Sequence, residues 1–213
     1  MLGASNVGKS SVINLLLGKN KITTSKYSGT TLKSINNKIP DTNITITDTP
    51  GLIPKEKRLS DMISVETGLK LVPAGEISRK TFKLGDGQIF MFDAFCRFKV
   101  KENKAVSKTE GENTYKPIFS AYSSKNVKFH VAKEERVGDL LQGDFFEILK
   151  GEEKKKYFAN KFVTFETTVE EDEDLVISGL GWINVKRGPL TIELTVPEGV
   201  KVIVRPSIFK GKK

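Results

Sequence analysis

The sequence predicts an incomplete α/β portion followed by a mainly antiparallel, β-rich α+β domain. Two observations lead to this prediction. From Gly3 to about Leu69, helix and strand signals alternate along the chain, which suits a layered α/β arrangement. Beyond about Pro73, strand-like runs separated by glycine and proline turns follow one another. We therefore expect a domain boundary between residues 1–72 and residues 73–213.

The first portion contains one expected helix and two expected strands. The helical segment opens near Gly8 and ends at Gly18. The run 43–48 alternates apolar and polar residues, as half-buried strands do, and the run 35–39 places Ile35, Asn37 and Ile39 on one side of a strand; a proline follows each run. The apolar residues at helical spacing are Val12, Leu15 and Leu16.

The second portion is expected to be built from strands with a single helix. The helical pattern covers residues 137–146 and is weakened by its glycines. The β-rich runs are 79–84, 88–100, 116–123, 127–132, 161–169, 175–185, 190–196 and 200–204.

Composition narrows the classes of protein. The formal net charge of +9 favours polyanionic partners, although a lysine-rich surface also keeps a protein soluble. The acidic run 170–174 is expected to be a solvated loop. No apolar run approaches the roughly 18 residues that span a bilayer, and the first residues do not read as a signal peptide. We expect a cytoplasmic protein with no membrane partner.

The chain has one cysteine, Cys96, and one histidine, His130. A lone cysteine in an apolar run is expected to be an inert core thiol, and His130 is expected on a surface strand. There is no cluster of cysteine and histidine, so no zinc is expected in this chain.

The amino-terminal motif carries the clearest chemistry. Residues 3–10 read Gly-Ala-Ser-Asn-Val-Gly-Lys-Ser and fit the phosphate-binding loop pattern G-x-x-x-x-G-K-[ST]. Glycines let the backbone amides curl around phosphates, and the following helix adds its positive end. Lys9 is expected to reach the β- and γ-phosphates, and the Ser10 hydroxyl to bind Mg²⁺. The other expected nucleotide-binding residues of this loop are Ser5, Asn6, Val7, Gly8 and Ser11.

Two further motifs follow at suitable spacing. Asp48-Thr49-Pro50-Gly51 lies at the end of an expected strand, where a carboxylate can support Mg²⁺ and the Gly51 amide can contact the γ-phosphate. Between the two motifs, Thr30 and Thr31 lie in a polar stretch that is either an ordinary turn or a switch closing over the nucleotide. We favour the switch, with Thr31 as the Mg²⁺ ligand.

These motifs together resemble the YqeH family of circularly permuted GTPases. The second half agrees, because Glu76-Ile77-Ser78-Arg79 resembles the start of that family's C-terminal domain. The family's Ser-Gly-Leu-Gly-Trp signature has its counterpart at residues 178–182. The amino-terminal segments that carry the resemblance are 3–10, 23–25, 28–31 and 48–51.

The resemblance implies a cytoplasmic bacterial factor that binds and hydrolyses GTP during assembly of the small (30S) ribosomal subunit. Its implied partners are the small subunit or its precursor, 16S rRNA or ribosomal proteins. In the family the guanine-reading elements precede the phosphate loop, so we expect this chain to lack them, along with the family's amino-terminal zinc module. This lack would leave the isolated chain inactive. The run Asn37-Lys38-Ile39-Pro40-Asp41 is not the missing N-K-x-D element, because its aspartate comes one residue late.

The resemblance also bears on mechanism. Leu52 stands where Ras-like enzymes place a glutamine, which is typical of hydrophobic-substituted GTPases. Asn6 matches the asparagine that helps to hold K⁺ in several such enzymes. The expected catalytic residues are Lys9, Thr31 and Gly51, with GTP or GDP, Mg²⁺ and K⁺ as cofactors.

The second portion offers basic residues beside aromatic residues at 79–83, 97–99 and 154–158. These clusters either contact RNA, with bases stacking on the rings, or place the rings in the core and the lysines outside. The run 179–182, Gly-Leu-Gly-Trp, indicates either a close backbone approach beside a core indole or the rim of a binding site.

Two alternatives to a GTPase follow from the residues alone. The chain could be a non-catalytic RNA- or protein-binding module that retains only the phosphate loop. It could also be an ATPase, since the loop does not distinguish purines.

Overall fold

The computed structural model describes residues 9–18, 35–39, 42–48, 57–73, 75–105 and 116–209. Its contacts divide the chain into two compact units, Met1–Lys55 and Glu56–Lys213. This division falls earlier than the expected boundary at residue 72. The physical reason is that Leu59 and Leu71 are buried in the core of the second unit.

The described part of the first unit consists of one helix and a two-stranded antiparallel sheet. Helix α1 spans Lys9–Leu17, strand β1 spans Ile35–Lys38 and strand β2 spans Thr45–Asp48. The register pairs Ile35 with Asp48, and the Thr47 hydroxyl donates a hydrogen bond to Asn36 Oδ1 at 2.7 Å. All three elements form where the sequence predicts them.

The face that α1 buries is not the one formed by Val12, Leu15 and Leu16. Ile13 and Leu17, four residues apart, are buried and pack with Ile39 and Ile46. Leu15 is 81% exposed. The helix is apolar around most of its circumference, so the spacing of apolar residues could not identify which side meets the hairpin.

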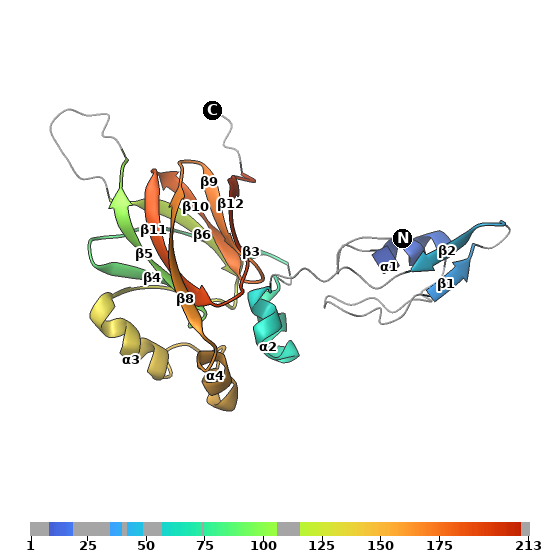
Figure 1. Ribbon diagram of the computed structural model, residues 1–213, viewed down its shortest axis with the longest axis horizontal. Helices are drawn as coiled ribbons and strands as arrows, with labels where there is room; N and C mark the ends of the chain where they lie inside the picture. Colours follow the sequence, from blue (N-terminus) through green and yellow to red (C-terminus); the bar gives the residue numbers. More distant parts are fainter. Residues whose placement is uncertain are drawn as a thin grey trace. The chain divides into compact units, whose positions relative to one another are not determined.

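The second unit is a sandwich of two antiparallel five-stranded sheets (Figure 1). The sheet orders are β12-β9-β10-β6-β3 and β7-β4-β5-β11-β8. The strands are β3 Ile77–Lys83, β4 Gln88–Phe92, β5 Cys96–Asn103, β6 Ile118–Ser124, β7 Phe129–Lys133, β8 Phe162–Val169, β9 Glu173–Ile177, β10 Gly181–Arg187, β11 Leu190–Pro197 and β12 Val202–Pro206.

The fold class is therefore confirmed, with two refinements of the strands. The runs 88–100 and 175–185 are each two strands rather than one. A tight turn at 93–95 separates β4 from β5, and a turn at 178–180 separates β9 from β10. Apolar residues continue through the first turn, where Phe95 is buried, so the turn does not stand out in the sequence.

Aromatic side chains fill the space between the two sheets. Phe90 of one sheet and Phe119 of the other pack edge to face with ring centroids 5.1 Å apart. Phe98 is 5.2 Å from Phe119 and 5.1 Å from Phe90, and all three rings are fully buried or nearly so. Such edge-to-face contacts add to the hydrophobic gain from burial.

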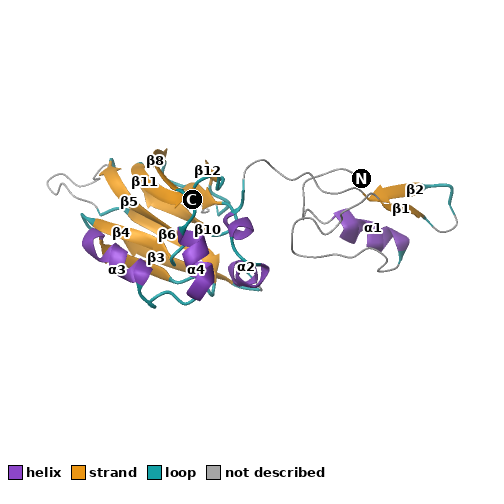
Figure 2. Ribbon diagram, turned by 60° about the horizontal axis from the view of Figure 1, so that its bottom comes forward, coloured by secondary structure: helices purple, strands orange, loops and turns teal. Residues whose placement is uncertain are grey.

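The helices of this unit gather at one end of the sandwich (Figures 1 and 2). They are η1 Leu59–Met62, α2 Val65–Leu71, η2 Glu134–Arg136, α3 Val137–Gln142 and α4 Gly151–Phe158. Helix α3 lies within the predicted run 137–146, whereas α4 was not predicted. Its sequence, Gly-Glu-Glu-Lys-Lys-Lys-Tyr-Phe, has almost no apolar periodicity. The helix is anchored by Tyr157, which is buried and donates its hydroxyl hydrogen bond to the Phe95 carbonyl at 2.7 Å.

Among the described residues, no helix is long and apolar enough to cross a membrane.

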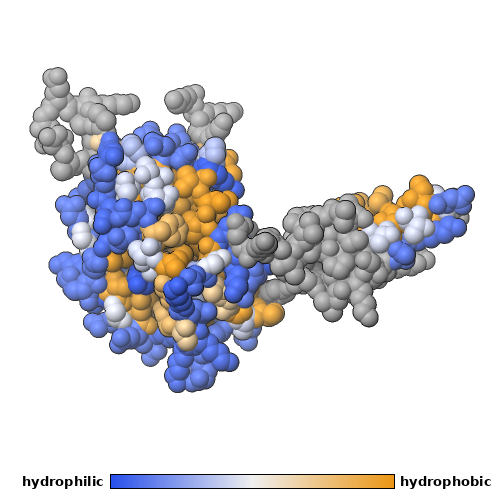
Figure 3. Space-filling model, in the orientation of Figure 1, coloured by the Kyte–Doolittle hydropathy of each residue, from blue (hydrophilic) through white to orange (hydrophobic). Residues whose placement is uncertain are grey.

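Apolar surface is exposed over the strands of the second unit and is bordered by hydrophilic side chains (Figure 3). The exposed large apolar residues of this unit are Val65, Leu69, Ile77, Phe165, Ile203, Val204, Ile208 and Phe209.

Candidate functional site

The candidate nucleotide site is only partly within the described residues. Lys9, Ser10 and Ser11 form the first turn of α1, and Asp48 is the last residue of β2. The remaining predicted residues lie outside the described residues: Ser5, Asn6, Val7, Gly8, Thr30, Thr31 and Gly51.

The local structure suits the chemistry predicted for this end of the chain. A helix that starts at Lys9 leaves backbone N–H groups of its first turn without intrahelical partners, and these groups attract anions. The strand that ends at Asp48 is hydrogen-bonded to β1, and Ile46 of this strand packs against α1. The helix and the Asp48 strand therefore belong to one packed unit, which is what a shared phosphate and metal site requires.

No other metal site emerges from the described residues, which contain no group of three or more histidine, cysteine, aspartate and glutamate residues placed to hold a metal ion.

Cys96 is 3% exposed, and burial raises the pKa of its thiol well above the ordinary value. His130 lies on β7 with its ring 4.6 Å from that of Phe145. Burial and the nearby charges of Lys128 and Arg136 lower the pKa of His130. The cysteine is thus the core thiol that the sequence predicts.

In all three basic and aromatic clusters of the second unit, the rings belong to the core, and Phe82 of the cluster 79–83 packs 4.9 Å from Phe90. Phe98 and Tyr157 are 1% exposed, so neither ring can stack on a ligand. Lys99 is ion-paired with Glu134 and Glu193, each at 3.2 Å. Neighbouring cations and anions thus neutralise one another on the outer face of this sheet. Lys101 extends the network to Glu166 and Glu193, at 3.3 and 3.4 Å.

The sequence predicts that the acidic run 170–174 is a solvated loop, and this prediction is only partly right. Asp174 is fully buried on β9. Its Oδ1 accepts a hydrogen bond from Asn184 Nδ2 at 2.9 Å, and its Oδ2 accepts one from the backbone N–H of Ile208 at 3.3 Å. Arg205 Nε lies 3.5 Å from Oδ2. These contacts give the buried carboxylate polar partners inside the fold.

An aromatic stack lies on the face of the β12-β9-β10-β6-β3 sheet that points away from the core. Trp182 on β10 and Tyr122 on β6 are register partners, with ring centroids 4.8 Å apart and planes within 4° of parallel. Phe209 stacks on both, 5.4 Å from Tyr122 and 6.4 Å from Trp182. The Arg79 guanidinium carbon lies 5.8 Å from the centre of the Tyr122 ring. We call Arg79, Tyr122, Trp182 and Phe209 the aromatic platform.

The platform was only partly visible in the sequence. The run Gly179-Leu180-Gly181-Trp182 left a core indole and a binding rim as alternatives, and Trp182 is half-buried on the outer face. Tyr122 and Phe209 were not singled out, because their partners are distant along the chain. Alternation within β6 and β10 could have placed Tyr122 and Trp182 on one face, but only the strand pairing brings them together.

The glycines beside Trp182 are explained by close packing. A Cβ on Gly181 would lie 2.2 Å from the Tyr122 carbonyl oxygen. Gly179 has φ +80°, and a Cβ there would lie 2.8 Å from Ser60 Oγ and 2.9 Å from Arg58 Cβ. The expectation of a close backbone approach at these glycines is confirmed.

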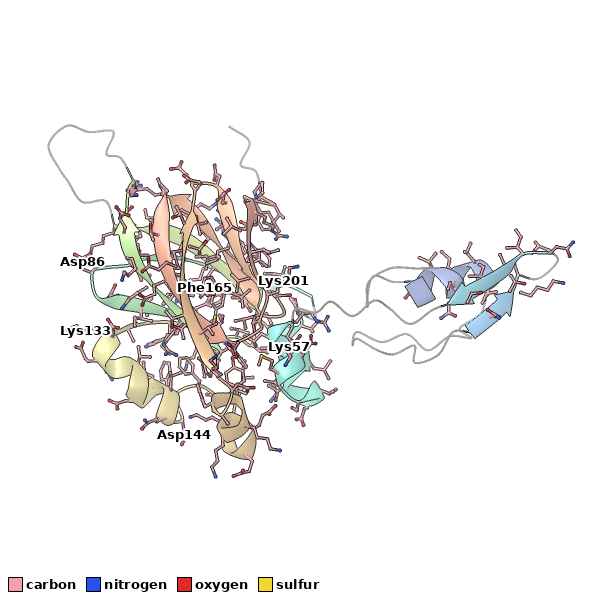
Figure 4. The ribbon with its side chains drawn as sticks, viewed as in Figure 1. Lys57, Asp86, Lys133, Asp144, Phe165 and Lys201 are labelled. Atoms are coloured by element: carbon pink, nitrogen blue, oxygen red, sulfur yellow. The ribbon has the colours of Figure 1, made fainter. Side chains whose placement is uncertain are left out.

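Those contacts are made by the segment that enters the second unit. The Leu59 N–H donates a hydrogen bond to the Ser178 carbonyl at 2.7 Å. Lys57 donates to Gly199 at 3.0 Å and accepts from Lys201 at 2.9 Å, and the two lysines lie close together in Figure 4. The chain following the Asp48-Gly51 motif is thus attached at Lys57 and Leu59 to the turns before β10 and β12.

Comparison with known proteins supports both halves. Residues 1–118 match the family model described as 50S ribosome-binding GTPase, and residues 116–208 match the one described as YqeH-like, C-terminal. A GTPase-family segment joined to this C-terminal domain defines the class of the chain. The chain belongs to the 50S ribosome-binding GTPase family and carries a YqeH-like C-terminal domain.

Named relatives agree with this assignment. The chain is 30% identical to the Bacillus subtilis protein named YqeH over 217 aligned positions, covering 98% of the chain and 56% of the relative. It is 38% identical over 96 residues to a probable ribosome biogenesis GTPase A of Mycoplasma pneumoniae, covering 45% of the chain and 32% of that protein. It is 33% identical over 96 residues to GTPase Der of Gemmatimonas aurantiaca, covering 44% and 20%. The chain thus spans about half of the YqeH relative.

Proposed function

We propose that this chain is the phosphate-binding and C-terminal part of a circularly permuted GTPase that acts in assembly of the small ribosomal subunit in the bacterial cytoplasm. The phosphate-loop motif running into α1 carries the proposal, since Lys9 to Ser11 form the first turn of that helix. The GTPase family model and the relatives named ribosome biogenesis GTPases support the activity and the ribosomal context. The small subunit rests on the YqeH resemblance, because the family model's description names the 50S subunit.

The proposed roles follow from residue chemistry. Lys9 holds the β- and γ-phosphates, and the loop amides from Ser5 to Ser11 surround them. Thr31 senses the γ-phosphate, and Gly51 couples it to the segment that leads to Lys57. With no general base among these residues, catalysis depends on positioning and electrostatics.

The donor set proposed for Mg²⁺ suits a hard cation. Ser10, Thr31 and Asp48 offer hydroxyl and carboxylate oxygens, which Mg²⁺ prefers. When bound, Mg²⁺ neutralises charge on the phosphate oxygens. Ser10 and Asp48 come from α1 and β2, two elements packed together within the first unit.

We also propose that Asn6 helps to hold K⁺, which would supply the positive charge that an arginine finger supplies elsewhere. Leu52 after Gly51 supports this view, because it removes the glutamine that orients water in Ras-like enzymes. Turnover in KCl should exceed turnover in NaCl at equal ionic strength. Equal rates in the two salts would contradict the role of K⁺ and leave the GTPase proposal intact.

The experiment that tests the function is nucleotide binding. Fluorescent GDP would be titrated into this 213-residue chain and into the full-length protein, with ATP and GTP as competitors. We expect tight binding to the full-length protein, displaced by GTP and not by ATP, and loss of binding in Lys9→Ala. Displacement by ATP would identify an ATPase.

A failure of the full-length protein to bind any nucleotide would favour the non-catalytic RNA- or protein-binding module. A matched control is Lys38→Ala, an exposed lysine on β1 outside the predicted loop. This variant should bind nucleotide as the wild type does. Purification of the protein with small-subunit rather than large-subunit precursors would test the ribosomal target.

A further inference from the structure

We propose that the aromatic platform is a stacking site for the bases of single-stranded RNA. The inference rests on the proposed ribosomal function, which supplies an RNA partner, and it assigns the contact to particular side chains. Two independent observations support it: the geometry of the rings and the cations beside them.

The outermost ring of the platform is exposed. Phe209 is 50% exposed although it stacks on Tyr122 and Trp182, whereas Tyr122 is only 4% exposed. Phe209 is therefore the outer ring of the platform, and Tyr122 supports it from below. Bases stack on such exposed rings regardless of sequence, because every base has a π-face.

Exposing an apolar ring to water is unfavourable, yet hydrogen bonds hold the backbone of Phe209 in place. Ile208, its neighbour, donates its backbone N–H to the buried Asp174 carboxylate, and the Phe209 N–H donates to Ser207 Oγ at 3.1 Å. Two hydrogen bonds thus fix the backbone that carries Phe209. A fixed aromatic ring loses little entropy when a base stacks on it.

The cations beside the platform distinguish this sheet from the other one. Strand β3 carries Arg79 and Lys83 on the same face as Tyr122; both are exposed and enter no ion pair among the described residues. On the other sheet, Lys99 and Lys101 are neutralised by glutamates. Unpaired cations next to stacked rings suit a phosphodiester chain, whereas the neutralised face does not.

The test uses the chain's single tryptophan as its reporter. A single-stranded decaadenylate RNA would be titrated into the full 213-residue chain while Trp182 fluorescence and RNA anisotropy are recorded. Inorganic polyphosphate serves as a probe that has charge but no bases. We expect RNA to quench Trp182 and polyphosphate to leave its fluorescence unchanged.

Two variants and two matched controls locate the contact. Phe209→Ala and Arg79→Ala should each weaken RNA binding about 10-fold, since a stacked base or a cation beside it is worth that much. Phe165→Ala removes a 37% exposed phenylalanine from β8 of the other sheet, and Arg136→Ala removes an exposed arginine from η2. Both controls should keep wild-type affinity. Unchanged urea midpoints would show that the variants are folded.

Several outcomes would overturn the proposal, and they are distinguishable. If RNA binds and the variants Phe209→Ala and Arg79→Ala keep full affinity, the platform is not the contact site, although the chain still binds RNA. If neither this chain nor the full-length protein binds RNA, the RNA contact fails as well, independently of nucleotide binding. Tighter binding by Phe209→Ala would make Phe209 a cover rather than a platform. Quenching by small-subunit proteins but not by RNA would make this face a protein-docking surface.

Discussion

Glu153 on α4 holds the first turn of α2 through Thr67. Its Oε2 accepts a hydrogen bond from the Thr67 hydroxyl at 2.7 Å, and its Oε1 accepts one from the Ser64 N–H, also at 2.7 Å. Thr67 and Glu153 are 86 positions apart in the sequence, so this carboxylate joins two distant helices. Helix α2 has only seven residues, so it depends on such contacts for its stability.

Replacing Glu153 should loosen α2. Glu153→Ala is expected to lower the free energy of unfolding by about 1–2 kcal/mol, because hydrogen bonds to a charged acceptor are lost. The measurement is the urea midpoint. Glu152→Ala is the matched control, since Glu152 is an exposed neighbour that bonds only to Lys155 among the described residues. A similar loss in both variants would contradict the anchoring role.

The same carboxylate predicts a pH dependence. Burial disfavours its charged form, but the hydrogen bonds from Thr67 and Ser64 outweigh this effect and lower the pKa of Glu153. A group with a lowered folded pKa stabilises the fold fully above its unfolded pKa, about 4.3, and loses this contribution as pH falls through the folded pKa. The stability difference between wild type and Glu153→Gln should therefore shrink between pH 6 and pH 3. A stability difference that stays constant over this pH range would argue against a lowered pKa of Glu153.

Two glycines should respond oppositely to alanine. Gly181→Ala is expected to destabilise the protein by at least about 2 kcal/mol, because its Cβ would meet the Tyr122 carbonyl at 2.2 Å. Gly138→Ala in α3 should stabilise it by about 0.5–1 kcal/mol, since nothing lies within 4 Å of the added Cβ and alanine favours helices. Thermal melting of both variants would settle the pair. A stable Gly181→Ala would mean that β6 and β10 are less closely packed.

Removing the buried carboxylate should disturb the C-terminal side of the outer sheet. Asp174→Ala removes one of the two acceptors of Asn184 Nδ2 and the acceptor of the Ile208 N–H, and leaves Arg205 unpaired, at an expected cost of about 2–4 kcal/mol. Urea unfolding gives the cost, and Glu171→Ala, an exposed neighbour, is the control. Tryptophan emission should also shift, because the backbone that holds Phe209 beside Trp182 is released. A normal spectrum and midpoint would refute the role of Asp174.

Cys96 should be chemically silent in the folded protein. Burial raises the pKa of its thiol and keeps reagents out, so the reactive thiolate is scarce. We expect no reaction with a thiol reagent under native conditions and one equivalent in urea. Fast native labelling would show that the β4–β5 turn opens easily.

The sequence predicts the architecture well because its signals are local. The phosphate loop, the turns and the alternation in β11 are each read from fewer than ten neighbouring residues. Helix α4 was not predicted because the contacts that hold it reach residues far along the chain, as the hydrogen bond of Tyr157 does to a residue 62 positions away. Such a contact leaves no periodic pattern in the sequence.

The phosphate-loop motif and the aromatic platform also differ in how far apart their residues lie along the chain. A contiguous motif such as residues 3–10 can be recognised from the sequence alone. The aromatic platform is not, because strands β3, β6 and β10 and the segment after β12 each supply one side chain. The buried state of Asp174 was likewise hidden, since four neighbouring acids suggested solvent while the pairing with β10 and β12 took this one inside.

The position of β3 at the end of its sheet has a consequence for solubility. An edge strand offers unpaired backbone groups to any other strand, including the same strand of a second molecule. Three cations within the seven residues of β3 make two such edges repel each other. Neutralising Arg79, Lys80 and Lys83 together would therefore invite self-association, which light scattering would detect as oligomers that dissolve when the charges are restored.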